Sequence, residues 1–419
     1  MKLTDEEQAM LAGDAGPGVK KAMEILTALG RIYGADDLVP VTSVQVAGVS
    51  YKTLGDAGLE FLADWAQQGA RVRVPTTLNP AGLDLERWQA LGFDADFAEK
   101  QARVIQAFVA MGVRPTCTCT PYYVGNLPAR GDHVAWSESS AVSFANSALG
   151  ARTNREGGPS ALAAAITGRT ARYGLHLPRH RRAQMVVDVR CPVTSPSDFG
   201  ALGALVGKVA RNRVLYFKFR VPAGELSAGS PPPSVLKSLG AAMAASGAVA
   251  LYHVEGVTPE ADQAGIIAPG AETLVVESLA DGYAMLNSDG GDDIDLVWIG
   301  CPHASLAELE QLVRLLNGRP CSTALWVTMA RRLRDEAAHS GLLQRFETLG
   351  GRVVADTCLV VAPVQSLGFR CMATPCGKGA YYAPSHSGLA VRYGSLEACI
   401  EAAVTGHWVA EARQVLDSR

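Results

Sequence analysis

The sequence has little charge and no large surplus of either sign. Charged residues make up 19% of its 419 residues, and the formal net charge is −3. Without a strongly basic balance, the chain has no electrostatic signature for binding nucleic acid or an anionic membrane. No apolar run approaches the roughly 18 residues of a membrane-spanning helix, and the polar residues 1–7 are unlike a secretory signal. We therefore expect a cytoplasmic protein.

The nine cysteines lack the spacing of the familiar metal-binding motifs. No pair forms the C-x2-C of a zinc ribbon, and the spacings match no ferredoxin run. In a cytoplasmic chain, cysteines are explained by metal binding, catalysis or packing rather than by disulfides. A metal site built from these cysteines would have to draw its ligands from distant parts of the chain.

What the sequence does have is apolar residues in alternating patterns. Hydrophobic residues make up 48% of the chain, enough for a large core, and the length suits two or three domains. From about residue 184 onward, strand-like runs alternate with helical stretches, which predicts parallel βαβ sheets. The runs are residues 185–189, 214–221, 248–254, 273–276, 294–299, 324–328 and 352–355. We expect an α/β fold with an N-terminal region, residues 1–183, and a C-terminal region, residues 184–419, made of two subdomains.

The N-terminal region has its own signals for helices and strands. Thr4 and Glu7 form a capping box for a helical stretch that runs to Gly30, with a glycine-rich interruption at residues 13–18. The further expected elements are strands at residues 41–49 and 72–74 and helices at residues 57–68 and 97–111. This region also holds the segments around Ser50, Cys119 and Arg152.

Cys301 follows a strand and precedes a helix. The apolar run 294–299 is typical of a buried parallel strand, and it stops at Gly300. Ser305 and Glu308 then form a capping box that opens an amphipathic helix. Cys301 is therefore expected in a strand-to-helix crevice, where open α/β sheets bind ligands. The alternative is a buried core cysteine, which is a common role of this residue.

Cys119 and Cys358 stand in similar positions. Cys119 follows a helix and a short expected strand, and Cys358 follows the strand at 352–355. Three thiolates from separate strand ends could hold three corners of an iron–sulfur cluster and leave one iron open to substrate. Cys117 cannot easily join Cys119 on one metal, so we expect it to pack in the core.

Several polar residues near these segments are candidates for substrate binding or catalysis. Arg152, Thr153, Asn154 and Arg155 precede a helix N-terminus and could bind a carboxylate, although a solvated surface is the alternative. The further candidates are Lys378 as an anion contact in a Gly-rich loop and Glu138 as an acid or base. Ser50 and Lys52 could bind a substrate carboxylate or donate a proton, and His303 could hydrogen-bond the cluster region or a leaving group of the substrate. A turn, a helix cap or a satisfied polar network would explain each of them equally simply.

Five segments together resemble the catalytic chain of the aconitase X family. They are Gly48-Val-Ser-Tyr-Lys-Thr, Thr118-Cys-Thr-Pro-Tyr, Gly150-Ala-Arg-Thr-Asn-Arg-Glu-Gly-Gly-Pro, Gly300-Cys-Pro-His and Asp356-Thr-Cys. The resemblance implies an aconitase-like fold of several α/β/α layered units with mostly parallel sheets around a central cleft. It also implies a dehydratase with an iron–sulfur cluster or a mononuclear iron held by Cys119, Cys301 and Cys358.

The chain departs from that family pattern in two ways. Relatives often have Thr-Asn-Ser where this chain has Thr374-Pro-Cys376, so Cys376 could be a fourth sulfur near the site. The family also needs a small swivelling domain with a Ser- and Gly-rich loop, and the sequence shows none. We therefore expect a large subunit that works with a separate small swivel-domain subunit, which could supply the base.

The resemblance leaves the substrate open. Bacterial relatives dehydrate cis-3-hydroxy-L-proline to a pyrroline-2-carboxylate, and archaeal relatives dehydrate phosphomevalonate. The sequence has no Gly-rich phosphate loop of known type. It therefore favours cis-3-hydroxy-L-proline, a compact amino acid, as the substrate, with phosphomevalonate as the alternative. A metal-free regulatory or binding subunit is the alternative of another class, and the presence of all three candidate ligand cysteines argues against it.

Overall fold

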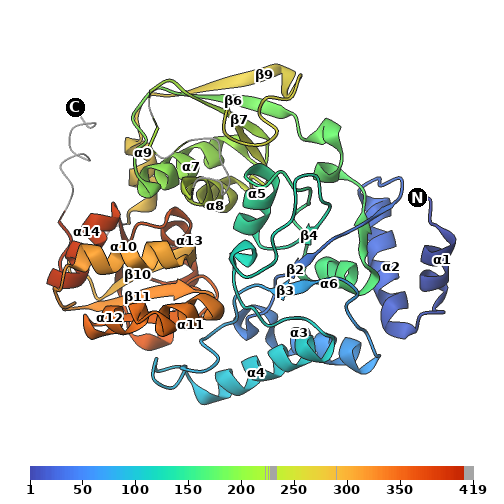
Figure 1. Ribbon diagram of the computed structural model, residues 1–419, viewed down its shortest axis with the longest axis horizontal. Helices are drawn as coiled ribbons and strands as arrows, with labels where there is room; N and C mark the ends of the chain where they lie inside the picture. Colours follow the sequence, from blue (N-terminus) through green and yellow to red (C-terminus); the bar gives the residue numbers. More distant parts are fainter. Residues whose placement is uncertain (222, 225, 227–233, 289, 410–419) are drawn as a thin grey trace.

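The fold is built on three separate parallel sheets and their helices. The computed structural model describes residues 1–409 except 222, 225, 227–233 and 289. Residues 1–180 occupy the right and bottom of Figure 1, residues 183–280 the top, and the last third of the chain the lower left. An α/β fold with mostly parallel sheets, as expected, is confirmed.

The five-stranded sheet of the C-terminal part is wholly parallel, in the order β12-β11-β10-β13-β14. Its strands are β10 (Leu296–Ala304), β11 (Ala324–Met329), β12 (Gly351–Ala355), β13 (Cys371–Thr374) and β14 (Ala390–Tyr393). Its helices are α10 (Leu306–Leu316), α11 (Arg331–His339), α12 (Leu342–Thr348), α13 (Gly377–Ser387) and α14 (Leu396–Thr405). The carboxyl ends of β10, β12 and β13 therefore meet at one edge of the sheet.

The four-stranded sheet is also parallel, in the order β8-β7-β6-β9. Its strands are β6 (Ala183–Val189), β7 (Leu215–Phe219), β8 (Tyr252–Val254) and β9 (Ile267–Val276). The helices α7 (Pro196–Ala210), α8 (Val235–Gly247) and α9 (Ala280–Leu286) follow three of these strands or connect to the next sheet. A capping box of Ser195 and Asp198 starts α7.

The N-terminal part contains a short three-stranded parallel sheet, β3-β2-β4, and an antiparallel pair, β1-β5. The strands are β1 (Leu38–Pro40), β2 (Val44–Val46), β3 (Thr76–Leu78), β4 (Ala135–Trp136) and β5 (Arg169–Ala171). The helices are α1 (Asp5–Ala12), α2 (Pro17–Ile32), α3 (Tyr51–Gln67), α4 (Ala95–Ala110), α5 (Ser139–Ser147) and α6 (Gly158–Thr167). Short 3-10 turns complete the described elements at Pro121–Tyr123, Gly174–His176, Pro178–His180 and Val364–Leu367.

Two expected elements are wrong, and several others are shorter or longer than expected; for example, the strand expected at 248–254 is only β8, and the one expected at 273–276 extends to the whole of β9. Residues 72–74 form no strand, and the strand lies at β3 instead, where Leu78 is fully buried. No strand leads directly to Cys119, which follows an irregular segment. The expected strand at 41–49 shrinks to β2, and β10 continues through Cys301 to Ala304.

The bulge in β10 explains why the sequence suggested that the strand ends at Gly300. Ile299 pairs with Val327 and Ala304 with Met329, so the residues between them bulge out of the ladder. Gly300 has φ 99°, and a Cβ there would come within 2.3 Å of the Thr328 carbonyl oxygen. A glycine is required at this close approach, and it marks the bulge rather than the strand end.

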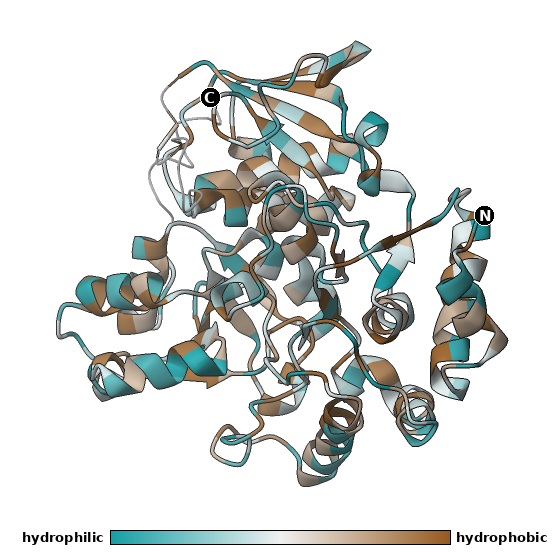
Figure 2. Cartoon of the chain, turned by 45° about the vertical axis from the view of Figure 1, so that its right-hand side comes forward, coloured by the Kyte–Doolittle hydropathy of each residue, from teal (hydrophilic) through white to brown (hydrophobic). Residues whose placement is uncertain are grey.

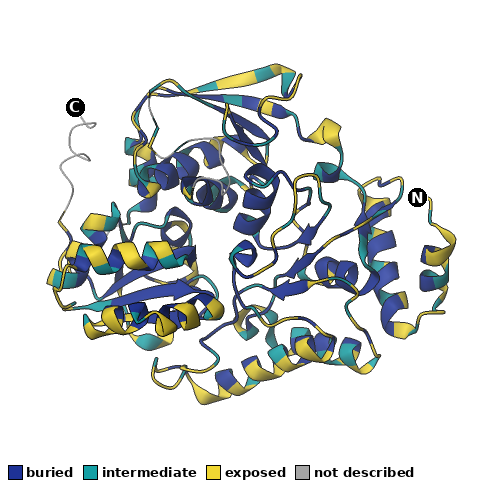
Figure 3. Cartoon of the chain, in the orientation of Figure 1, coloured by how far each residue is buried: buried dark blue, intermediate teal, exposed yellow. Residues whose placement is uncertain are grey.

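The central strands of the sheets are buried, and the outer helices that cover them are exposed on their outer faces. In Figure 3, β10 and β11 are dark blue, whereas the outer faces of α4, α10 and α12 are yellow. The same outer helices alternate teal and brown in Figure 2, the pattern of amphipathic helices with one face on a core. Within the described part of the chain, no helix is both long enough and apolar enough to cross a membrane.

Candidate active site

Four candidate residues gather at the carboxyl edge of the five-stranded sheet and the segments that face it. Cys301 lies in the bulge near the end of β10, Cys358 follows β12, and Lys378 follows β13. Cys119 reaches the same place from the N-terminal part of the chain. All three cysteine side chains are buried, and none forms a disulfide. Cys358 and Lys378 thus lie just beyond strand ends, where α/β sheets bind ligands.

His303 ties the three cysteine-bearing segments together. Its backbone N–H donates to the Cys119 Sγ at 3.2 Å. Its ring Nε2 donates to the Thr357 carbonyl oxygen at 2.9 Å, since a carbonyl can only accept. Its ring Nδ1 is 2.9 Å from the Thr118 hydroxyl. Because Thr118 precedes Cys119, Thr357 precedes Cys358 and His303 follows Cys301 by two residues, one buried imidazole fixes all three segments.

The imidazole of His303 is neutral in this arrangement. Burial lowers its pKa to about 4, and the nearby Lys237 acts in the same direction, while the bond to Thr357 opposes the shift. Both ring nitrogens already have partners, so the side chain is engaged with protein groups rather than turned toward a departing hydroxyl. In this arrangement the His303 side chain connects the Thr118 and Thr357 segments.

A buried acidic pair anchors the segment that carries Cys358. Asp84 accepts from the Ala355 backbone N–H at 2.9 Å, and the Ala81 N–H donates to the Asp356 carbonyl at 2.7 Å. Arg331 forms ion pairs with both Asp84 and Asp356. Because Asp84 and Ala81 belong to the N-terminal part of the chain, these bonds hold the Cys358 segment against it.

The three thiols lie close enough to influence one another electrostatically. Burial raises the pKa of Cys301 well above its usual value, and negative charge on Cys358 and Cys119 raises it further. Burial also raises the pKa of Cys119 and of Cys358. The Lys378 ammonium lowers the pKa of all three thiols. A metal or another cation would be needed to hold these thiols as thiolates at neutral pH.

Lys378 and Glu138 form a buried ion pair beside the cysteines. Burial by itself lowers the pKa of Lys378, but Glu138, followed by Cys301 and Cys119, raises it above its ordinary value. Burial raises the pKa of Glu138, and Lys378 outweighs that effect and lowers it. Lys378 also donates to the Ser139 hydroxyl at 3.1 Å. The expected Gly-rich loop is in fact the first turn of α13, so Lys378 is held by a helix.

Glu138 is the N-cap of α5 as well as the partner of Lys378. Its second carboxylate oxygen accepts from the Ala141 backbone N–H and the Ser140 hydroxyl, each at 2.6 Å. A carboxylate with these bonds and an adjacent ammonium is held in its ionised form. The pair therefore supplies fixed charges of opposite sign at the site.

Ser50 and Lys52 contact the backbone just after Cys358. Ser50 Oγ donates to the Val361 carbonyl at 2.9 Å, and Lys52 Nζ donates to the Ala362 carbonyl at 2.9 Å. Burial lowers the pKa of Lys52, although negative charge on Cys358 opposes this. No described carboxylate lies within 4 Å of the Lys52 ammonium. Lys52 is thus an exposed cation beside the Cys358 segment, with no acidic partner among the described residues.

The residues 152–155 do not gather at the cysteines as a group. The Thr153 hydroxyl accepts a hydrogen bond from the Trp136 backbone N–H, and the Asn154 side chain accepts one from the Leu175 backbone N–H. Both side chains therefore fix the backbone of neighbouring segments. Arg152 lines a separate cavity with Arg181. Arg155 is exposed and pairs through its backbone with Trp136, two residues before Glu138.

Several residues that shape this site carry no recognisable signal in the sequence. Thr118, Thr357 and Asp84 could be found only from the fold, since their bonds span many residues of sequence. Cys376 was noted as a possible fourth sulfur, and its Sγ accepts from the Cys301 N–H at 3.4 Å. It is the N-cap residue of α13, whose N-terminus therefore points toward Cys301.

Cysteine thiols are the ligands that iron–sulfur clusters use. Among the described residues, no three His, Cys, Asp or Glu side chains surround one point closely enough to hold a metal ion. In an iron–sulfur cluster, by contrast, each cysteine binds a different iron, so the sulfurs lie farther apart than around one ion. Three buried thiols with an adjacent ammonium and helix N-terminus fit that second arrangement.

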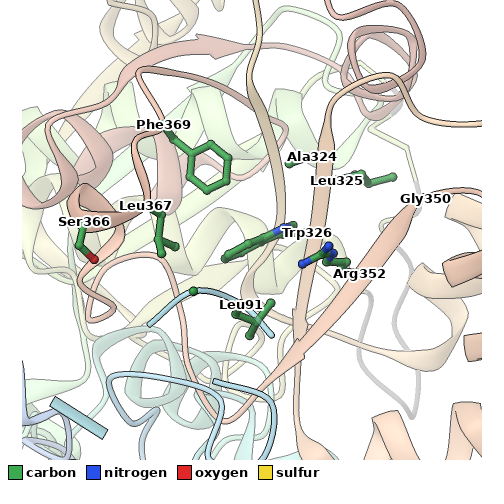
Figure 4. Close-up of a pocket in the computed structure, with 10 residues that line it drawn as sticks. Leu91, Ala324, Leu325, Trp326, Gly350, Arg352, Ser366, Leu367 and Phe369 are labelled. Atoms are coloured by element: carbon green, nitrogen blue, oxygen red, sulfur yellow. The ribbon is translucent and has the colours of Figure 1, made fainter. Parts of the chain in front are cut away.

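A cavity of about 480 Å³ lies at the opposite edge of the five-stranded sheet. Figure 4 shows Trp326, Arg352, Leu367 and Phe369 around it. Ala324 and Gly350, which also line it, stand at the amino ends of β11 and β12. Since α/β sheets bind ligands at their carboxyl ends, this cavity is remote from the chemistry of the cysteines.

Layered parallel sheets with three buried thiols gathered at a carboxyl edge define an α/β protein of the aconitase type. The chain matches the family models of the aconitase X first domain over residues 1–179, second domain over residues 183–280 and third domain over residues 294–405. It belongs to the aconitase X family of hydro-lyases.

Individual relatives support the same assignment. The chain is 50% identical over 389 residues to the phosphomevalonate dehydratase large subunit of Methanothermobacter thermautotrophicus, covering 92% of this chain and 95% of that one. It is 37% identical to the cis-3-hydroxy-L-proline dehydratase of Pseudomonas aeruginosa, covering 96% of this chain and 69% of that one. The crystal structure of Thermococcus kodakaraensis aconitase X in its holo-form matches with a TM-score of 0.88 at 48% identity, covering 96% of this chain and 100% of that one.

Proposed function

We propose that this chain is the catalytic large subunit of a phosphomevalonate dehydratase. The observation that carries the proposal is the likeness to the Methanothermobacter large subunit, which is high and nearly end to end in both chains. The P. aeruginosa hydroxyproline enzyme is less similar and extends well beyond the matched part. This proposal reverses the preference for hydroxyproline that the sequence alone suggested, because the absence of a known phosphate loop is weaker support than that likeness.

The proposal includes an iron–sulfur cluster held by Cys119, Cys301 and Cys358. Support comes from the three buried thiols, from the imidazole of His303 that fixes their segments, and from the ammonium of Lys378 beside them. When bound, such a cluster supplies a Lewis acid for the departing hydroxyl. The positive charge of Lys378, kept protonated by Glu138, would offset part of the negative charge of the thiolates.

Lys52 is the chain's best candidate for a direct substrate contact. Its ammonium has only carbonyl partners, lies beside the segment that follows Cys358, and has a pKa lowered by burial. A cation of this kind can bind a carboxylate or phosphate and can also give up a proton at its Nζ. We propose Arg155, exposed near Glu138, as a second anion contact, and Ser50 as a residue that positions the Cys358 segment.

The name "large subunit" of the relatives supports a small-subunit partner. We propose that the partner carries a swivelling domain that covers the cysteine edge and completes the catalytic groups. Closure by such a domain would exclude water from the reacting atoms.

The second candidate function is dehydration of cis-3-hydroxy-L-proline. It is favoured by the match to the P. aeruginosa enzyme over nearly the whole of this chain. The deciding experiment is to measure kcat/KM for both substrates on the iron-loaded large subunit assembled with its small subunit. We expect phosphomevalonate to be preferred, and a preference for the hydroxyproline would overturn the substrate assignment while leaving the cluster proposal standing.

A further inference from the structure

A second cavity lies between the 3-10 turns at residues 174–180 and the start of the four-stranded sheet. It has a volume of about 470 Å³, within the usual range for small-molecule sites. Its lining includes the four arginines Arg152, Arg179, Arg181 and Arg182. Among the described residues that line it, Glu260 is the one acid.

Glu260 does not neutralise this group of arginines. Its carboxylate pairs with Arg181 at 2.8 Å, and both side chains are buried. No described carboxylate lies within 4 Å of Arg152, Arg179 or Arg182. Arg182 donates to the Gly265 carbonyl, and the buried Nε of Arg152 has no hydrogen-bond partner in the described part of the chain. Three guanidinium groups thus share one cavity without a counter-charge.

The neighbouring histidines show the effect of this positive charge. Burial, His133, Arg181 and Arg152 lower the pKa of His176 to about 3. The same two arginines, with Arg172, lower the pKa of His133 in addition to its burial. Neither imidazole therefore adds a proton at neutral pH, and the Nε2 of His176 is buried without a hydrogen-bond partner.

The cavity is separate from the cysteine site. Arg181 donates to the Asn146 and Ala151 carbonyls at the carboxyl end of α5, both at 3.1 Å. Glu138, beside the cysteines, caps the amino end of the same helix. A helix of this length spans on the order of 13 Å at 1.5 Å per residue. A ligand in the cavity would not touch Lys378 or the thiols.

We propose that this cavity binds the phosphate or diphosphate group of a small organic anion. Arginine pairs bidentately with phosphate oxygens, and three such groups in one half-buried space suit a dianion or trianion better than a single carboxylate. Pro178 and Ile266 in the lining offer apolar surface for a short hydrocarbon part. Nothing in the proposed dehydration requires this site, so it is a separate property of the chain.

The test is calorimetric titration of the full chain with inorganic pyrophosphate and with inorganic phosphate. We expect pyrophosphate to bind the more tightly. The variant R179Q/R182Q should bind it about tenfold or more weakly, since each loses a charge-assisted hydrogen bond. The control R314Q removes an equal charge from an exposed arginine on α10 and should bind as the unaltered chain does.

A second variant separates charge from folding. R182K keeps the positive charge but not the bidentate geometry, so it should bind pyrophosphate more tightly than the single variant R182Q and more weakly than the unaltered chain. Absence of pyrophosphate binding to the unaltered chain would overturn the proposal. So would equal affinity in R179Q/R182Q and R314Q, because pyrophosphate would then be bound elsewhere.

Discussion

At the scale of single residues, the account depends on three cysteines that are far apart in sequence. The sequence suggested that Cys119, Cys301 and Cys358 lie together because each was expected after a strand, although only Cys358 directly follows the end of one. It could not reveal the role of His303, because the partners of its ring, Thr118 and Thr357, are 185 and 54 residues away. Hydrogen bonds between residues so far apart produce no periodic or local pattern in the amino-acid sequence.

Replacing any one of these cysteines with serine should remove most of the bound iron. The physical reason is that an alcohol does not replace a thiolate as an iron ligand, and turnover should fall by about tenfold or more. The measurement is iron and acid-labile sulfide in anaerobically purified protein. Cys321→Ser is the matched control, because Cys321 precedes β11 at the other edge of the sheet. Full iron content in all three variants would be incompatible with the proposed ligand set.

His176 should make stability depend on pH. Its folded pKa of about 3 lies below the unfolded value of about 6.5, so the folded state resists protonation. The stabilisation is complete above pH 6.5 and declines as the pH falls toward 3. Between pH 7 and pH 5, His176 should account for about 2 kcal/mol of lost unfolding free energy.

The measurement is denaturant unfolding of the unaltered chain and of His176→Gln at those two pH values. The variant should lose less stability between them. His180→Gln, which alters an exposed histidine, should keep the full dependence. An identical loss in all three proteins would show that His176 does not carry the effect.

At the scale of elements, the sequence predicted the alternation of strands and helices far better than their limits. The capping boxes at Thr4 and Ser305 were read correctly because they are local signals with fixed spacing. The sequence did not predict that β10 continues through Cys301, because a glycine at a bulge looks in the sequence like the end of a strand. The helix α13 was missed as well, because Gly377, Gly379 and Pro384 are weak helix formers.

The ion pair of Glu138 and Lys378 joins two helices, α5 and α13, across the site. Lys378→Met should lower the free energy of unfolding by about 3–5 kcal/mol, because it leaves the Glu138 carboxylate buried without its partner. The double variant Glu138→Gln/Lys378→Met should recover part of that loss. A double-mutant cycle by denaturant unfolding measures the coupling, and additive effects of the two changes would show that the pair does not act as a unit.

At the scale of the whole molecule, the cysteine site is assembled from both halves of the chain. Asp84, Ser50 and Lys52 of the N-terminal part all contact residues 355–362 of the C-terminal part. The sequence predicted the fold class, which is confirmed, and the three-thiol group stays a prediction that rests on motifs. It could not predict these contacts, which depend on how the two parts pack.

The 419-residue chain alone should be folded and bind iron but be nearly inactive. Without the small subunit, the cysteine edge lacks its covering domain and a catalytic group. The measurement compares turnover of phosphomevalonate by the iron-loaded chain before and after addition of the small subunit. Full activity of the chain alone would contradict the need for a partner.

The central claim is that one iron–sulfur cluster is held at the meeting point of Cys119, Cys301 and Cys358. The most direct test is a crystal structure of the anaerobically purified chain with anomalous diffraction at the iron edge. The account predicts one compact cluster of iron atoms, with each of the three Sγ atoms at a bonding distance of about 2.3 Å from a different iron of that cluster. An iron peak bound by other residues, or a fully iron-loaded protein in which one of the three thiols is unbound, would contradict it.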